Sequence, residues 1–194
     1  MTGDQAAGRQ CILDQAQRLF FVHGYHGVSI RDIVQACGLS NAALYYHFGS
    51  KQNLFVQVFK EYVAILVHKV QRVGTGGGSC AERLVRLAEA YAHFVLDSRI
   101  ESQILLRDLM EFDGEEIRHL IRDAEGQIPF MFATVLEEGI AAGEIRTVDA
   151  GRISLLVHGM INSLTAHYML DTAAETLSED IALAINTLFE GIGT

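Results

Sequence analysis

The segment from Val28 to Leu54 most constrains the fold, because it encodes two short amphipathic helices joined by a sharp turn. The first helix carries apolar residues at the i, i+3, i+4, i+7 spacing of one buried face: Ile30, Ile33, Val34 and Cys37. Gly38 suits the left-handed end of a helix, and Ser40 suits the N-cap of the next one. This order of signals predicts a helix-turn-helix.

The second helix of this pair predicts the partner. Leu44 and Phe48 face the first helix, and small or hydrogen-bonding side chains are expected outward: Asn41, Ala42, Tyr45 and His47. An outer face of this kind fits the major groove of DNA. The sequence therefore predicts a DNA-binding protein.

The charge is divided unevenly along the chain. The net charge of −9 is unusual for a protein that binds DNA. Residues 1–72, however, hold seven Lys and Arg against four Asp and Glu, whereas residues 73–194 hold eight against twenty. A mildly basic head on an acidic body predicts contact with phosphates at one end only.

The chain has three cysteines, Cys11, Cys37 and Cys80, and no CxxC pair. This number gives no disulfide framework. We therefore expect a reducing cytoplasm, with buried or inert thiols. Cys80 follows a flexible stretch, so exposure and a redox role are an alternative for this residue.

The periodicity predicts an all-α fold of about nine helices, with a three-helix head and a larger helical body. Capping-box pairs are expected before several helices: Ser29 with Asp32, Ser79 with Glu82, Ser98 with Glu101, and Asp113 with Glu116. The helices are expected over about 9–23, from Ser29, 40–47, 50–72, from Cys80, from Arg99, 114–142, 150–170 and 178–190. We expect a head domain over residues 1–50 and a second domain over 51–194.

Two interruptions stand out in this pattern. Residues 74–79 read GTGGGS and predict a flexible connector; a phosphate-binding loop is disfavoured because no Lys follows and no strand precedes. Pro129 lies inside a helical pattern and predicts a kink or a break, because it lacks a backbone donor.

The segment from Ile153 to Leu170 contains no charged residue. Its length reaches the lower limit for a membrane span, but six polar side chains make that alternative unfavourable. With hydrophobic residues at 49 % of the chain, burial against a second subunit is more economical. We expect a homodimer through helices near 150–170 and 179–190.

The run LYYHFGSK over 44–51, preceded by Gly38-Leu39-Ser40, resembles the tetracycline-repressor (TetR/AcrR) family of bacterial regulators. The resemblance covers about residues 9–60; beyond them it is limited to the helix pattern. It implies a homodimer on a palindromic DNA operator. It also implies that a small molecule in the helical body moves the fourth helix and releases the DNA.

The resemblance assigns roles in the head residue by residue. Ser29 and Arg31 would meet phosphate or a flanking base, and Leu44, Phe48 and Tyr46 would pack the head. Base edges would face Ser40, Asn41, Ala42 and Ala43, and the DNA backbone would contact Tyr45, His47 and Lys51. Ala42 and Ala43 offer no hydrogen bonds, so base readout would rest mainly on Asn41, with a contribution from DNA shape.

The effector cavity is expected among side chains of the helices that the family uses: Tyr62, Leu66, Phe94, Leu105, Met110, Phe130, Met131, Thr134, His158 and Asn162. Core packing is the alternative for most of them. A metal site built on His93 and Asp97, at i, i+4 spacing, with His119, His158 or His167, is disfavoured. We expect no cofactor.

The sequence thus predicts a cytoplasmic, ligand-responsive transcriptional repressor that is not an enzyme. The apolar composition of the body favours a hydrophobic or amphipathic effector. An activator or architectural DNA binder without an effector is an alternative. A helical enzyme with a DNA-binding head is a remote one, because no nucleophile elbow or cofactor fingerprint occurs.

Overall fold

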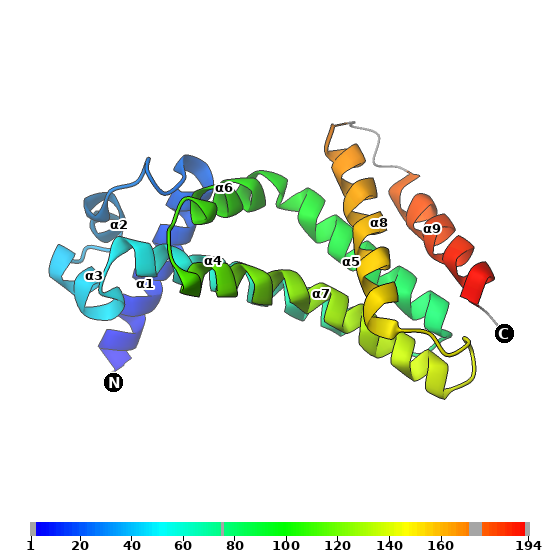
Figure 1. The fold of residues 1–194 in the computed structure, drawn as a ribbon. Helices are drawn as coiled ribbons and strands as arrows, with labels where there is room; N and C mark the ends of the chain where they lie inside the picture. Colours follow the sequence, from blue (N-terminus) through cyan, green and yellow to red (C-terminus); the bar gives the residue numbers. More distant parts are fainter. Residues whose placement is uncertain (1–2, 75, 171–175, 193–194) are drawn as a thin grey trace. The chain divides into compact units, whose positions relative to one another are not determined.

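The fold is helical, as a computed structural model that describes residues 3–74, 76–170 and 176–192 shows (Figure 1). Nine helices lie within these residues: α1 (Gly3–His23), α2 (Ile30–Ala36), α3 (Asn41–Phe48), α4 (Lys51–Gly74), α5 (Cys80–Asp97), α6 (Arg99–Met110), α7 (Glu115–Ala141), α8 (Ala150–Leu170) and α9 (Leu177–Ile192). The all-α prediction is confirmed.

The chain packs as two compact units. The first contains Met1–Ala64 with Ile100–Ile117, and the second contains Ile65–Arg99 with Arg118–Thr194. By packing, the first unit therefore includes the start of α4 and most of α6 in addition to α1–α3. The functional division at residue 50 stays a prediction.

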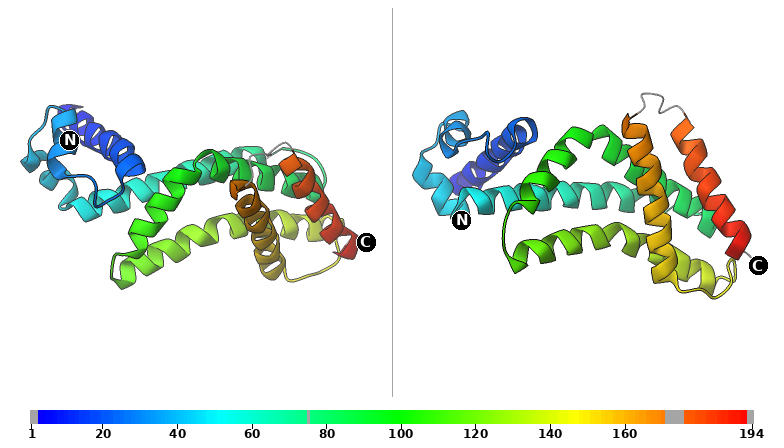
Figure 2. Two further views of the ribbon diagram at one scale, coloured as in Figure 1. Left: turned by 90° about the horizontal axis from the view of Figure 1, so that it is seen from above. Right: turned by 45° about the horizontal axis from the view of Figure 1, so that its top comes forward.

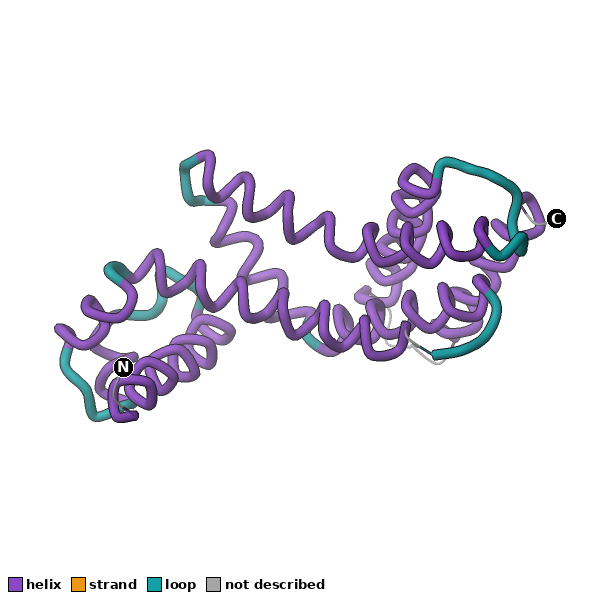
Figure 3. Tube along the Cα trace, turned by 90° about the horizontal axis from the view of Figure 1, so that it is seen from below, coloured by secondary structure: helices purple, strands orange, loops and turns teal. Residues whose placement is uncertain are grey.

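The first unit is held together by a core to which every head helix contributes. The helices α1, α2 and α3 pack against one another (Figure 3). Fully buried side chains come from each of them and from α4: Ile12, Phe20, Ile33, Leu44 and Phe55. The rings of Phe20 and Phe55 meet edge to face, with centroids 5.0 Å apart. This core fixes the position of α3.

Local capping signals explain where the head helices begin and end. Ser29 and Asp32 form the predicted capping box at the start of α2. Gly38 adopts a φ of +66°, as the turn into α3 requires. Ser40 has the extended backbone of an N-cap, but its side chain makes no capping hydrogen bond.

The second unit has a core in which α5 packs against α8 and α9, and α8 packs against α9. Figure 2 shows α8 and α9 side by side in both views. The predicted capping box of Ser79 and Glu82 opens α5. The helix α7 runs through Pro129 without interruption, so the alternative of a break was wrong.

Ser98 was expected to form a capping box before the helix from Arg99, but its hydroxyl makes a different hydrogen bond. Its hydroxyl donates to the carbonyl oxygen of Phe94 at 2.6 Å, and Ser98 is the C-cap of α5. The helix α6 nevertheless begins next to it, at Arg99. The side chain of Glu101, the expected partner, lies outside the described residues.

The expectation of buried or inert free thiols was wrong for Cys11 and Cys37 and is confirmed for Cys80. Cys11 and Cys37 form a disulfide, which joins α1 to the residue that ends α2. Cys80, whose exposure was the alternative, is 2 % exposed. Its thiol donates to the carbonyl oxygen of Val135 at 3.4 Å.

The outer faces of α8 and α9 carry apolar side chains in solvent. Leu155 and Leu156 on α8 are 61 % and 59 % exposed, and Leu183 on α9 is 66 % exposed. Among the described helices, none combines the length and apolarity needed to cross a bilayer. Both helices, α8 and α9, therefore expose apolar surface within this chain.

Candidate nucleic-acid interface

The outer face of α3 presents hydrogen-bonding side chains to solvent. Ser40, Asn41 and Ala42 are exposed, and Tyr45 and Tyr46 are 52 % and 72 % exposed. The expectation that Tyr46 packs the head was wrong. Tyr46 is two positions from Leu44, which is about 200° around a helix, so it points away from the core. Helical spacing alone indicates this position as a further candidate for contact with DNA.

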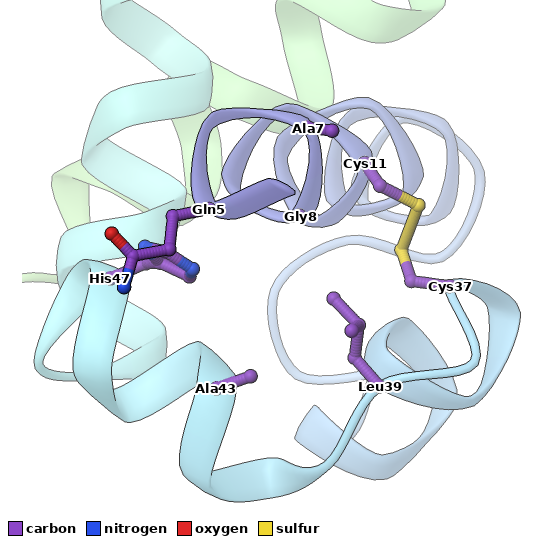
Figure 4. Close-up of a pocket in the computed structure, with 8 residues that line it drawn as sticks. All are labelled: Gln5, Ala7, Gly8, Cys11, Cys37, Leu39, Ala43 and His47. Atoms are coloured by element: carbon purple, nitrogen blue, oxygen red, sulfur yellow. A yellow bond between two sulfur atoms is a disulfide. The ribbon is translucent and has the colours of Figure 1, made fainter. Parts of the chain in front are cut away.

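Ala43 and His47 lie on the side of α3 that faces α1, and both are half-buried. With Leu39 and the Cys11–Cys37 disulfide they line an open pocket of about 380 Å³ (Figure 4). The ring of His47 lies near Tyr46, with centroids 5.0 Å apart. These two predicted DNA contacts therefore border the outer face rather than occupy its centre.

At the start of α2, Ser29 and Asp32 are paired with each other and Arg31 is exposed. The hydroxyl of Ser29 donates to the Asp32 carboxylate at 2.6 Å and accepts from the Asp32 N–H at 3.2 Å. Hydrogen bonds from the side chain and backbone of Ser29 lower the pKa of Asp32. The single hydroxyl proton of Ser29 is thus already used, whereas the Arg31 side chain is exposed.

Lys51 has an acceptor inside the head. Its ammonium donates to the carbonyl oxygen of Tyr25 at 2.5 Å and lies 4.1 Å from the centroid of the Tyr25 ring. Burial lowers the pKa of Lys51, with an opposing effect from Asp32. An ammonium has three donors, so this hydrogen bond leaves others for an external anion.

Tyr25 is held from α6 as well. Its backbone N–H donates to the carboxylate of Asp108 at 2.6 Å, and the Asp108 side chain is 2 % exposed. A Cβ on Gly24 would lie 2.6 Å from the same carboxylate, so this close approach requires glycine. Burial raises the pKa of the Tyr25 phenol. No local pattern in the sequence marks Asp108, so its role is visible only in the structure.

The predicted effector residues divide between the two units. In the first unit Tyr62 and Leu105 are buried and Met110 is 66 % exposed. In the second unit Phe94 is buried, Phe130 is 72 % exposed, and Leu66 and Met131 pack against the core. The Thr134 hydroxyl donates to the carbonyl oxygen of Phe130 at 3.0 Å.

His158 and Asn162 form a polar cluster with Tyr91 in the second unit. The Tyr91 hydroxyl donates to Asn162 Oδ1 at 2.7 Å, and His158 Nε2 lies 3.2 Å from the same hydroxyl. Burial lowers the pKa of His158, so its neutral form is favoured. Over the described part of the chain, no three His, Cys, Asp or Glu side chains gather as a metal site would require.

Two family sequence models match most of the chain. The model described as bacterial regulatory proteins of the tetR family matches residues 12–58. The model described as a tetracyclin repressor-like C-terminal domain matches residues 77–171. The first match contains all of α2 and α3, so it coincides with the exposed face described above.

Individual relatives agree with this result. The chain is 29 % identical over 153 residues to the HTH-type transcriptional repressor AcnR of Corynebacterium efficiens, covering 78 % of this chain and 72 % of the repressor. A transcriptional regulator from Saccharomonospora viridis, solved in complex with choline, is 25 % identical with a TM-score of 0.74 over 97 % of this chain and 99 % of that one. A TetR-family protein from Mesorhizobium loti has the same fold at 19 % identity, with a TM-score of 0.78 over 98 % of both chains.

Proposed function

The chain belongs to the TetR family of bacterial regulatory proteins, and on this premise we propose that it is a repressor released from a palindromic operator by a hydrophobic or amphipathic effector. Proteins of this family regulate transcription and are not enzymes. The single observation that carries the proposal is the outer face of α3, which combines exposed amide and phenol groups with a rigid, capped helix pair behind it.

The DNA contacts divide into base readout and backbone contact. Asn41 is the best candidate for base readout, because an amide pairs with both edge groups of adenine. Ala42 and Ala43 add close approach or contact with thymine methyl groups, and Ser40 lies at the same helix end. Contacts with the DNA backbone would come from Arg31, Tyr45, His47 and Lys51. The exposed Tyr46 is a further candidate for such a contact. Ser29 would act by fixing α2 and not as a donor to phosphate.

A second copy of the chain is the partner that we propose for α8 and α9. The exposed leucines Leu155 and Leu156 lie in the part of α8 that has no charged residue, and Leu183 is exposed on α9. Packing two copies of each helix together would bury these faces in a four-helix interface. Two heads would then read half-sites about 34–36 Å apart, or slightly more. We place the dimer in the cytoplasm, where bacterial DNA lies.

The effector site is proposed in the second unit, around the polar cluster of Tyr91, His158 and Asn162. These three groups can exchange hydrogen bonds with a ligand, and Tyr91 and Met131 both pack against the apolar core of the same unit. One polar cluster within an apolar body suits an amphipathic effector. The relative solved with choline supports a small-molecule ligand for this fold.

The proposal is tested in three linked measurements on the full chain. Sedimentation should give a dimer, and Leu155→Asp with Leu183→Asp should give a monomer with unchanged helix content. The dimer should select an inverted repeat from a random DNA pool. A compound found by thermal-shift screening should raise the melting temperature and weaken binding to the selected DNA. A compound that stabilises the protein without changing DNA affinity would contradict the repressor mechanism.

A further inference from the structure

The disulfide in the head lies at the point where the recognition helix is connected to the rest of the unit. Cys11 is in the middle of α1, and Cys37 is the C-cap of α2, directly before the Gly38 turn and three residues before Ser40. Their Cα atoms are 5.9 Å apart, which is within the range for disulfides. The bridge therefore ties α1 to the turn that leads into α3.

Small molecules have access to this bridge. Both cysteines are half-buried and line the open pocket, opposite Ala43 and His47 of α3 (Figure 4). Cys80 is different, since it is 2 % exposed and burial raises its pKa to about 11. Among the three cysteines, Cys11 and Cys37 are thus the two that a solute can reach.

We propose that Cys11 and Cys37 are a reversible redox site, which low-molecular-weight thiols reach through the pocket and whose bridged state binds operator DNA more tightly. In the reaction a dithiol attacks one sulfur as its thiolate and forms a mixed disulfide, and the other cysteine leaves as a thiolate and takes up a proton. The second thiol of the dithiol then displaces the remaining cysteine. Two electrons pass from the dithiol, which becomes a disulfide, to the protein.

The link to DNA follows from the position of Cys37. Two separate thiols cannot stay at bonding distance, so reduction removes the covalent link between α1 and the turn of Gly38 and Leu39 and leaves only non-covalent packing there. The buried side chains of Ile33, Leu44 and Phe48 still hold the head together, so α3 becomes less restrained without unfolding. A preorganised α3 binds with a smaller entropic cost. The inference rests on the DNA binding proposed above.

The coupling between bridge formation and DNA binding is reciprocal, so it can be measured in two separate experiments. We expect reduction with dithiothreitol to weaken binding to the selected duplex by about fivefold or more. The same duplex should then shift the thiol–disulfide equilibrium toward the bridge by the same factor. The first is measured by fluorescence anisotropy, and the second by trapping free thiols with N-ethylmaleimide in mixtures of reduced and oxidised dithiothreitol, followed by mass spectrometry.

Matched variants separate the possible causes. Cys11→Ser and Cys37→Ser should each bind DNA like the reduced protein and ignore dithiothreitol, whereas Cys80→Ala should respond like the unmodified chain. Circular dichroism checks that each variant is folded. Free thiols at both positions under oxidising conditions, or equal or tighter DNA binding after reduction, would overturn the inference. Loss of DNA binding in both redox states would instead overturn the proposed function, and the trapping experiment would still report on the bridge.

Discussion

The carboxylate of Asp108 on α6 accepts a 2.6 Å hydrogen bond from the backbone N–H of Tyr25, 83 residues earlier in the chain. Lys51 donates to the carbonyl oxygen of the same residue, so α4 and α6 hold both backbone groups of Tyr25. The Tyr25 ring adds edge-to-face contacts with Phe55 and Phe112. The turn between α1 and α2 is thereby fixed by elements outside the helix-turn-helix.

Asp108→Ala should destabilise the first unit by about 1–3 kcal/mol, because it leaves the half-buried Tyr25 N–H without its charged acceptor and removes the ion pair with Arg107. Asp108→Asn keeps an acceptor oxygen and should lose less. Urea unfolding followed by circular dichroism measures both. Asp123→Ala removes an exposed carboxylate on α7 and serves as the control; an equal loss in this variant would show that the Asp108 contact has no special role.

These residues also show what sequence reasoning could and could not predict. The capping boxes of Ser29 with Asp32 and of Ser79 with Glu82 were predicted correctly, because each partner lies three residues from the other. The Asp108–Tyr25 hydrogen bond and the Cys11–Cys37 disulfide depend on how separate helices pack. No local spacing encodes such contacts, so they had to be seen in the structure.

Tyr46 is an instructive intermediate case. The family resemblance suggested a packed ring, although the buried pair Leu44 and Phe48 already placed position 46 on the opposite side of the helix. The structure agrees with the helical spacing, with 72 % of the residue exposed. The effector residues could not be resolved in this way, because buried apolar side chains follow the same pattern in a core and in a ligand cavity.

The stability of the second unit should depend on pH through His158. Burial holds the pKa of His158 below its ordinary value of 6.5, so the unfolded chain binds more protons than the folded one between these two values. Stability is therefore full above about pH 6.5 and falls as the pH drops through the folded pKa. His158→Gln should remove this part of the pH dependence. Melting temperatures recorded from about pH 5 to about pH 8 measure it.

The control for this prediction is His68→Gln, since His68 is an exposed histidine on α4. This variant should keep the acid-induced loss of stability seen in the unmodified chain. Identical pH profiles for the unmodified chain and His158→Gln would show that the His158 site does not contribute.

Cys80 should resist alkylation in the folded protein. Burial raises its pKa to about 11, so only about 0.1 % of this thiol is ionised at pH 8, and the thiolate is the reactive form. A Cβ on Gly139 would lie 2.6 Å from the Cys80 sulfur, so the thiol is also closely packed. After the bridge is reduced, N-ethylmaleimide should label Cys11 and Cys37, and label Cys80 only in urea. Labelling of all three at one rate would contradict this packing.

Asn41 and Tyr46 should make different contributions to DNA binding. Asn41→Ala should reduce the discrimination between the selected duplex and one altered at the contacted base pair by about 1–3 kcal/mol, because the amide pairs with a base edge.

Tyr46→Ala should instead weaken binding to both duplexes equally, by about 1 kcal/mol, because a phenol that donates to phosphate carries no sequence information. Gln127→Ala on the exposed side of α7 should change neither value. Competition binding at fixed salt distinguishes the two roles, and a uniform loss in Asn41→Ala would move base readout away from Asn41 and toward DNA shape.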